Sequence, residues 1–103
     1  MRQRWTNRPF VDELPDLLRE RDLSLRALAR EVRVSDAHLS RLLRGVGYRS
    51  VPSAELARRI AGALGLPSDY FKEVRQHYIL DKVRADAEVC NSVYRSLKRR
   101  FGD

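Results

Sequence analysis

The clearest periodic pattern lies in the first half of the chain, where apolar residues recur every three or four positions in two short runs. The first run covers residues 25–32 and the second covers residues 36–44. Their apolar positions are Leu25, Leu28, Ala29 and Val32, then Leu39, Leu42 and Leu43. Ser24 and Ser35 precede the runs, where a hydroxyl can cap the first backbone N–H groups, and Gly45 follows the second. The pattern predicts two short amphipathic helices.

The connection between these helices is too short for anything but a tight turn, because only Arg33 and Val34 separate the first helix from the second cap. Two helices joined in this way form a helix-turn-helix. The outward positions of the second helix are small at its start and basic further along, as suits a helix that enters a DNA major groove: Asp36, Ala37, Ser40, Arg41 and Arg44. The motif therefore predicts sequence-specific DNA binding.

Similar patterns predict helices on both sides of this motif. Asp12 can cap a helix that ends at Arg21, with Pro15 in its first turn and a buried stripe of Leu14, Leu17 and Leu18. Ser53 can cap a helix that Gly65 ends, with Leu56, Ala57, Ile60, Ala61 and Leu64 on one face. Ser68 is expected to start the last helical region, in which Tyr70, Phe71 and Val74 close the core.

The residues from 76 to 100 form a second functional segment, because the predicted domain needs little beyond Val74. Apolar residues advance there in alternating steps of three and four, as in the seam of a coiled coil or an antiparallel helix pair: Leu80, Val83, Ala87, Cys90, Tyr94, Leu97 and Phe101. We expect this helix to dimerise, with Cys90 as a buried, reduced thiol. Alternatively it folds back on its own domain, since Ile79, Val89 and Val93 widen the stripe.

Composition agrees with a nucleic-acid partner. The 103 residues carry a net charge of +7 and a pI near 10.3, which favours polyanions, although solubility alone could account for it. One cysteine excludes an internal disulfide, and no apolar run at the N-terminus resembles a signal peptide or membrane span, so the cytoplasm is the expected location. Arg2, Arg4 and Trp5 fall in a loosely ordered basic arm without periodicity.

From Leu14 to about Val74 the chain resembles the Cro/C1-type (XRE) helix-turn-helix family. The motifs at family spacing are Leu28-Ala29, Val34-Ser35, Leu39-Ser40-Arg41-Leu42, Arg44-Gly45, Pro52-Ser53, Ile60-Ala61 and Ala63-Leu64-Gly65-Leu66. The resemblance implies an all-α, five-helix, lambda-repressor-like domain, here with an additional C-terminal helix. It implies base contacts from Asp36, Ala37 and Arg41, flanked by His38 and Ser40. It implies phosphate contacts from Ser24, the backbone N–H of Leu25, Arg44, Tyr48 and Arg49.

The chain departs from the family at two positions. Arg33 stands where the family commonly has glycine, so a residue with a Cβ must adopt a left-handed conformation or the turn must adjust, at a cost near 1 kcal/mol. Leu43 stands where many members have glutamate, and we expect it to be buried against the fourth helix. Neither departure changes the expected docking mode.

Each candidate contact also has a structural interpretation. Arg41 can donate to guanine O6 and N7 with both arms of its guanidinium, or it can be a solvated surface arginine. Asp36 can accept from cytosine N4, but as an anion in the first helical turn it also stabilises the helix dipole, and this second interpretation is slightly favoured. His38 and His77 have no neighbours at metal-ligand spacing, so no metal or other cofactor is expected.

The sequence thus predicts a basic arm at residues 1–9, a DNA-binding domain at 10–75 and a dimerisation helix at 76–103. The leading hypothesis is a dimeric transcriptional repressor that binds a pseudo-palindromic operator in double-stranded DNA. The alternative is an antitoxin-like interaction protein, whose C-terminal helix binds a partner protein while DNA binding serves autoregulation. An enzyme is not expected, because His38, His77 and Cys90 lie on separate predicted helices without a nucleophile, base and orienting group in combination.

Overall fold

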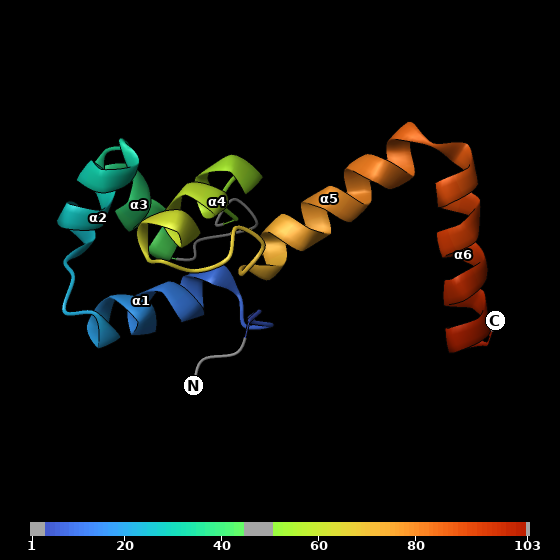
Figure 1. Cartoon of the computed structure of the whole chain (residues 1–103), viewed down its shortest axis with the longest axis horizontal. Coiled ribbons are helices and arrows are strands. Elements are labelled where there is room, and N and C mark those ends of the chain that lie inside the picture. The colour runs from blue at the N-terminus through green and yellow to red at the C-terminus, as the bar shows by residue number, and fades with distance from the viewer. Residues whose placement is uncertain (1–3, 45–50, 103) are drawn as a thin grey trace.

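A computed structural model describes residues 4–44 and 51–102, and these residues form an all-α fold without strands. The helices run in the order α1 (Phe10–Glu20), α2 (Leu25–Val32), α3 (Asp36–Leu43), α4 (Ala54–Ala63), α5 (Lys72–Ala85) and α6 (Ala87–Phe101). Helices α1 to α4 form one body, α5 begins at its edge against α4, and the rest of α5 and all of α6 project from this body (Figure 1). The expected class, a helix-turn-helix domain with an additional C-terminal helix, is confirmed.

One apolar core holds α1 to α5 together. It contains the buried stripes that periodicity predicted, and Tyr70, Phe71 and Val74 close it after α4. Its buried members are Phe10, Leu14, Leu17, Leu18, Leu28, Ala29, Val32, Leu39, Leu42, Leu56, Ala57, Ile60, Ala61, Leu64, Tyr70, Phe71 and Val74. Phe71 packs edge-on against Phe10 and Tyr70, with ring centroids 5.0 and 5.3 Å away. Leu43, expected to be buried, is only half-buried at the edge of this core.

The three predicted serine caps are present. The hydroxyls of Ser24, Ser35 and Ser53 accept hydrogen bonds from the third residue after each serine, at 3.1, 3.0 and 3.1 Å. Between α2 and α3, Arg33 adopts the left-handed conformation, the first of the two alternatives left open by the sequence, with φ 62° and ψ 46°. The N–H of Val34 then donates to the carbonyl of Ala29 at 3.0 Å, which ends α2 and turns the chain into α3.

Helix α1 begins two residues before the predicted cap at Asp12. Pro9, with φ −57°, precedes the helix, and the N–H groups of Asp12 and Glu13 both donate to its carbonyl at 3.0 Å. Proline holds the backbone angle that a helix start needs, and the Glu73 carboxylate of α5 accepts from the N–H of Phe10 at 3.0 Å, so the first turn is capped from another helix. Pro15, which was expected in the first turn, consequently lies further inside the helix, so that prediction was wrong.

Helix α5 begins later than predicted. Ser68 does not start it, because the chain first makes a turn in which the N–H of Tyr70 donates to the carbonyl of Pro67 at 3.0 Å. Phe71, with ψ 136°, is the extended residue before the first helical turn. Arg75 stabilises this turn by donating to the carbonyls of Asp69 and Tyr70, both at 2.9 Å.

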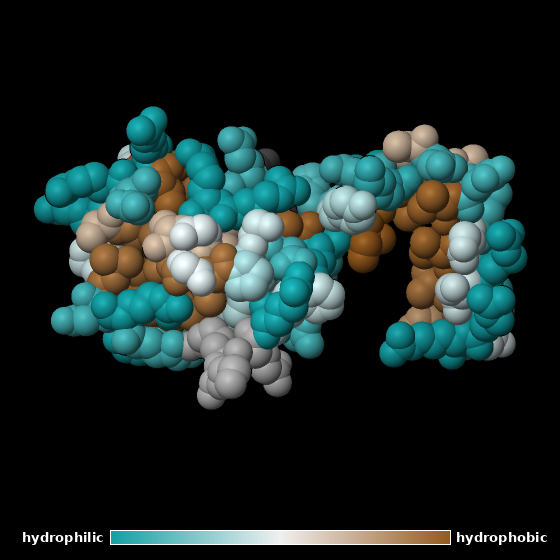
Figure 2. Space-filling model, in the orientation of Figure 1, coloured by the Kyte–Doolittle hydropathy of each residue, from teal (hydrophilic) through white to brown (hydrophobic). Residues whose placement is uncertain are grey.

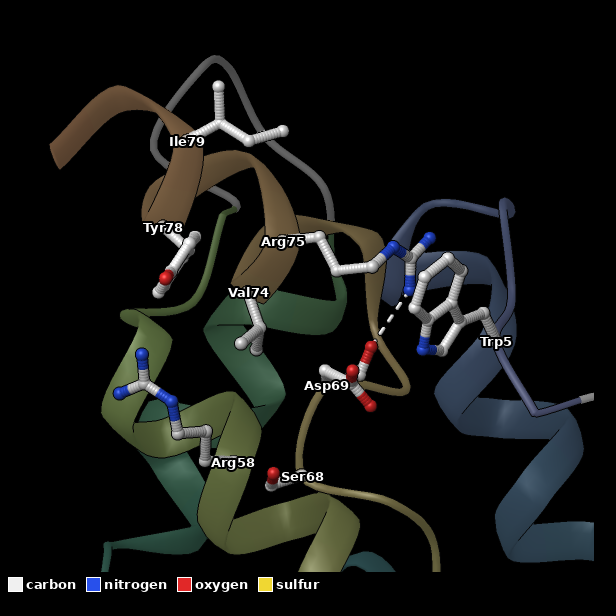
Figure 3. A pocket seen from close by; sticks show the side chains of 8 residues that line it. All are labelled: Trp5, Arg58, Ser68, Asp69, Val74, Arg75, Tyr78 and Ile79. Carbon is white, nitrogen blue, oxygen red and sulfur yellow. Dashed lines mark hydrogen bonds between the residues drawn. The ribbon is translucent and has the colours of Figure 1, made fainter. Parts of the chain in front are cut away.

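Residues 4–9 are bound to the domain and do not form a loose arm. The N–H of Thr6 donates to the carbonyl of Tyr70 at 3.0 Å, and Arg75 donates to the carbonyl of Thr6 at 2.8 Å. The Arg75 guanidinium also lies 4.7 Å from the centre of the Trp5 ring, and Figure 3 shows the two side chains face to face. These contacts join segments that are distant in sequence, so composition could not reveal them.

The predicted C-terminal helix is divided into two. Asp86 has φ −140° and ψ 113°, and its carboxylate accepts from the N–H groups of Glu88 and Val89 at 2.9 and 3.3 Å. An aspartate at this position caps a new helix instead of continuing the old one. The seam is therefore split, with Leu80 and Val83 on α5 and the later members on α6. The expected boundary at residue 75 falls inside α5.

Candidate nucleic-acid interface

The two helices of the motif are fixed by their inner faces. Leu28, Ala29 and Val32 of α2 are buried, as are Leu39 and Leu42 of α3. Arg59 of α4 donates to the carbonyl of Val32 at 2.9 Å, which satisfies an end group of α2 that has no partner inside its helix. The outer face of α3 is therefore held in one orientation and stays available to a ligand.

Four of the five predicted base-contacting residues are exposed on this outer face. Asp36, Ala37, His38 and Arg41 are exposed, whereas Ser40 is half-buried. The first three form the start of α3, and Arg41 lies about one turn further along, as the 3.6-residue repeat requires. The structure thus brings these side chains together, and it leaves Ser40 less accessible than the rest.

The predicted phosphate contacts are found at two helix ends. Ser24 is the exposed cap of α2, and Leu25 begins the first turn, whose N–H groups have no acceptor within the helix. Arg44 is the exposed residue that ends α3, with helical φ −68° and ψ −18°. Tyr48, Arg49 and the predicted stop at Gly45 lie outside the described residues.

Exposed cations surround this face. They are Arg26, Arg30 and Arg33 in and after α2, and Arg41 and Arg44 in and after α3. Arg26 also donates from Nε to Asp36 Oδ2 at 3.2 Å, which joins α2 to the start of α3. Sequence reasoning missed this pair, because ten positions separate its members and no helical repeat relates residues on different helices.

Other chemistries find little support in the described part of the chain. No three His, Cys, Asp or Glu side chains cluster there in a way that could hold a metal ion. His38, His77 and Cys90 lie on α3, α5 and α6. None of the described helices has the length and apolar character needed to cross a membrane.

A cavity of about 540 Å³ lies at the base of α5, away from the α3 face. Figure 3 shows its lining from α4, the turn before α5, α5 itself and the N-terminal segment: Trp5, Arg58, Ser68, Asp69, Val74, Arg75, Tyr78 and Ile79. None of these residues belongs to α2 or α3. The cavity is thus separate from the candidate interface.

Comparisons with known proteins agree with the geometry of α2 and α3. A family model described as helix-turn-helix matches residues 16–71, which is more than half of the chain. No curated protein sequence and no solved structure matches the chain. The matched span covers most of the buried core, the left-handed turn at Arg33 and the exposed face of α3. The chain therefore belongs to the Cro/C1-type (XRE) helix-turn-helix family of DNA-binding transcription regulators.

Proposed function

We propose that the protein is a transcriptional repressor that binds a pseudo-palindromic operator as a dimer. Helix α3 enters the major groove of each half-site, and bound protein blocks access of RNA polymerase. Arg41 donates to a guanine, Ala37 lets the helix backbone approach the bases, and Asp36 and His38 lie beside them. Ser24, the N–H of Leu25, Arg44, Tyr48 and Arg49 contact phosphates on either side.

The observation that carries this proposal is the exposed face of α3. Its base-reading candidates are accessible while Leu39 and Leu42 on the opposite face are 0% and 7% exposed. Five exposed arginines lie on or next to α2 and α3, and each cation that reaches a phosphate releases condensed counterions. The face thus combines sequence-reading groups with a general attraction to DNA.

Dimerisation is supported by apolar side chains that the monomer leaves in water. On α5 these are Tyr78, Ile79 and Leu80, and on α6 they are Tyr94, Leu97 and Phe101, each between 49% and 68% exposed. In Figure 2 an apolar surface runs along the side of α6 that faces the body of the protein. Contiguous apolar surface of this kind is characteristic of an interaction site. A second copy would cover it and set two α3 helices one DNA turn apart.

A selection of bound duplexes from a random pool, read by sequencing, tests the reading of DNA, and sedimentation of the free protein tests the dimer. We expect two inverted half-sites about 10 base pairs apart and a dimer at micromolar concentration. Enrichment of no sequence would contradict operator recognition. A single half-site together with a monomer would contradict the dimer.

The same apolar surface also fits the antitoxin-like alternative. Because Asp86 splits the seam between two helices, the seam residues do not form one straight stripe. A second protein that fills the angle between α5 and α6 is then as compatible with the exposed residues as a second copy. A monomer in sedimentation that still binds a single half-site would favour this alternative.

A further inference from the structure

An exposed ion pair marks the point where the two helices of the motif meet. Arg26 Nε lies 3.2 Å from Asp36 Oδ2, and the two side chains are 78% and 49% exposed. Pairs this exposed contribute little to folding, since water and salt screen the charges. Asp36, one member of the pair, is the first residue of α3 and lies on the face that carries the predicted base contacts. Its location therefore suggests a role in binding.

Asp36 is out of place on a surface that approaches phosphates, because its carboxylate repels them. The repulsion is offset if the carboxylate reaches a base edge and accepts a hydrogen bond from an amino group, such as cytosine N4. Arg26 occupies Oδ2 and leaves Oδ1 as an acceptor. Within the described residues, Arg26 Nη1 and Nη2 have no acceptor of their own and are available as donors.

We infer that Arg26 and Asp36 act as one unit that reads a C·G base pair at the start of α3. In the major groove this pair presents the N4 amino group of cytosine next to the O6 and N7 acceptors of guanine. Asp36 Oδ1 accepts from the cytosine while the terminal nitrogens of Arg26 donate to the guanine. Arg26 is then a specificity-determining residue from α2, and the inference rests on the proposed reading of DNA by α3.

Duplex selection with four proteins tests this unit: wild type, Arg26→Ala, Asp36→Asn and the double variant. We expect the wild type to prefer C·G at one position of each half-site. Each single variant should lower that preference about 10-fold, which corresponds to one lost base contact. The double variant should lower it no further, because residues that act as a unit are not additive.

Arg30→Ala is the matched control, since it removes the same charge from the same helix and no ion pair links Arg30 to α3 in the described residues. As one of the five exposed arginines near this face, Arg30 should lower the affinity for all duplexes alike when it is replaced, and the base preference should stay unchanged. If Arg26→Ala instead weakens binding to all duplexes equally, Arg26 contacts a phosphate and the inference is overturned. If the wild type enriches a sequence motif and neither single variant changes it, only the Arg26–Asp36 inference is overturned. If the wild type enriches no duplex at all, the proposed function is overturned as well.

Discussion

Among single residues, Arg41 offers the most direct test of the proposed contact between α3 and DNA bases. It is exposed one turn after the start of the helix, where a guanidinium can reach guanine O6 and N7. We expect Arg41→Ala to lower the preference at one base pair per half-site by about 10-fold, and to retain non-specific binding. Competition between operator and random duplexes measures this ratio. Arg19→Ala on α1 is the control, and equal loss on all duplexes would place Arg41 on a phosphate.

Arg33 tests the strain in the turn between α2 and α3. Its φ of 62° costs a residue with a Cβ roughly 1 kcal/mol, and its side chain is exposed. Arg33→Gly removes this cost but gives the unfolded chain more freedom, so we expect a net gain of about 0.5 kcal/mol and a melting temperature a few degrees higher. Arg33→Val should lower the melting temperature. A glycine variant less stable than wild type would show that the turn is unstrained.

Between elements, Arg75 joins the N-terminal segment to α5. It donates to the carbonyls of Thr6, Asp69 and Tyr70 and lies against Trp5. Hydrogen bonds from a charged donor contribute more than neutral ones, so Arg75→Ala should destabilise the fold by about 2 kcal/mol. Trp5 is the one tryptophan of the chain, so its fluorescence reports the release of the segment as a red shift. Arg75→Lys should be intermediate, and unchanged fluorescence in the alanine variant would contradict the docking.

Asp86 controls the direction of α6. Replacing it with alanine removes a cap worth about 1 kcal/mol and leaves a strong helix former at the break. We expect α5 and α6 to join more often into one long helix, which raises helicity by circular dichroism and extends the molecule beyond its 15.9 Å radius of gyration. X-ray scattering measures the extension. Asp86→Asn keeps a capping side chain and should behave as wild type, whereas an alanine variant of unchanged size would show that packing sets the angle.

For the whole molecule, the apolar surface of α5 and α6 is where we propose that a second copy binds. Val83→Asp together with Leu97→Asp places two charges where a second copy would bury them, at a cost that an interface cannot offset. We expect the double variant to sediment as a monomer and to bind a full operator more weakly, by a factor that can reach roughly 10². Asn91→Asp with Ser92→Asp adds the same charge elsewhere on α6 and should remain dimeric. A dimer in the first variant would place the association elsewhere.

Local patterns determined most of the fold, because helix periodicity and capping depend on residues three or four positions apart. The buried faces of α2, α3 and α4 and their serine caps follow from such neighbours, whereas at Arg33 the sequence left open a left-handed residue or an adjusted turn. The exposed side chains on α3 were equally readable, except for Ser40, which is half-buried. Once the inner face of a helix is known, its outer face is determined by geometry.

Two kinds of feature were decided only by the tertiary structure. The first are contacts between residues that are distant in sequence, and the second are positions where the local sequence allowed two conformations. The docking of Trp5 and Thr6 needs Arg75, which is about seventy positions away, and the ion pair of Arg26 and Asp36 needs α2 and α3 in their final positions. At Asp86 the apolar seam favoured one continuous helix while the carboxylate favoured a new start, and the cap prevailed. Sequence periodicity predicts neither long-range contacts nor which of two competing local conformations forms, since both depend on where the rest of the chain lies.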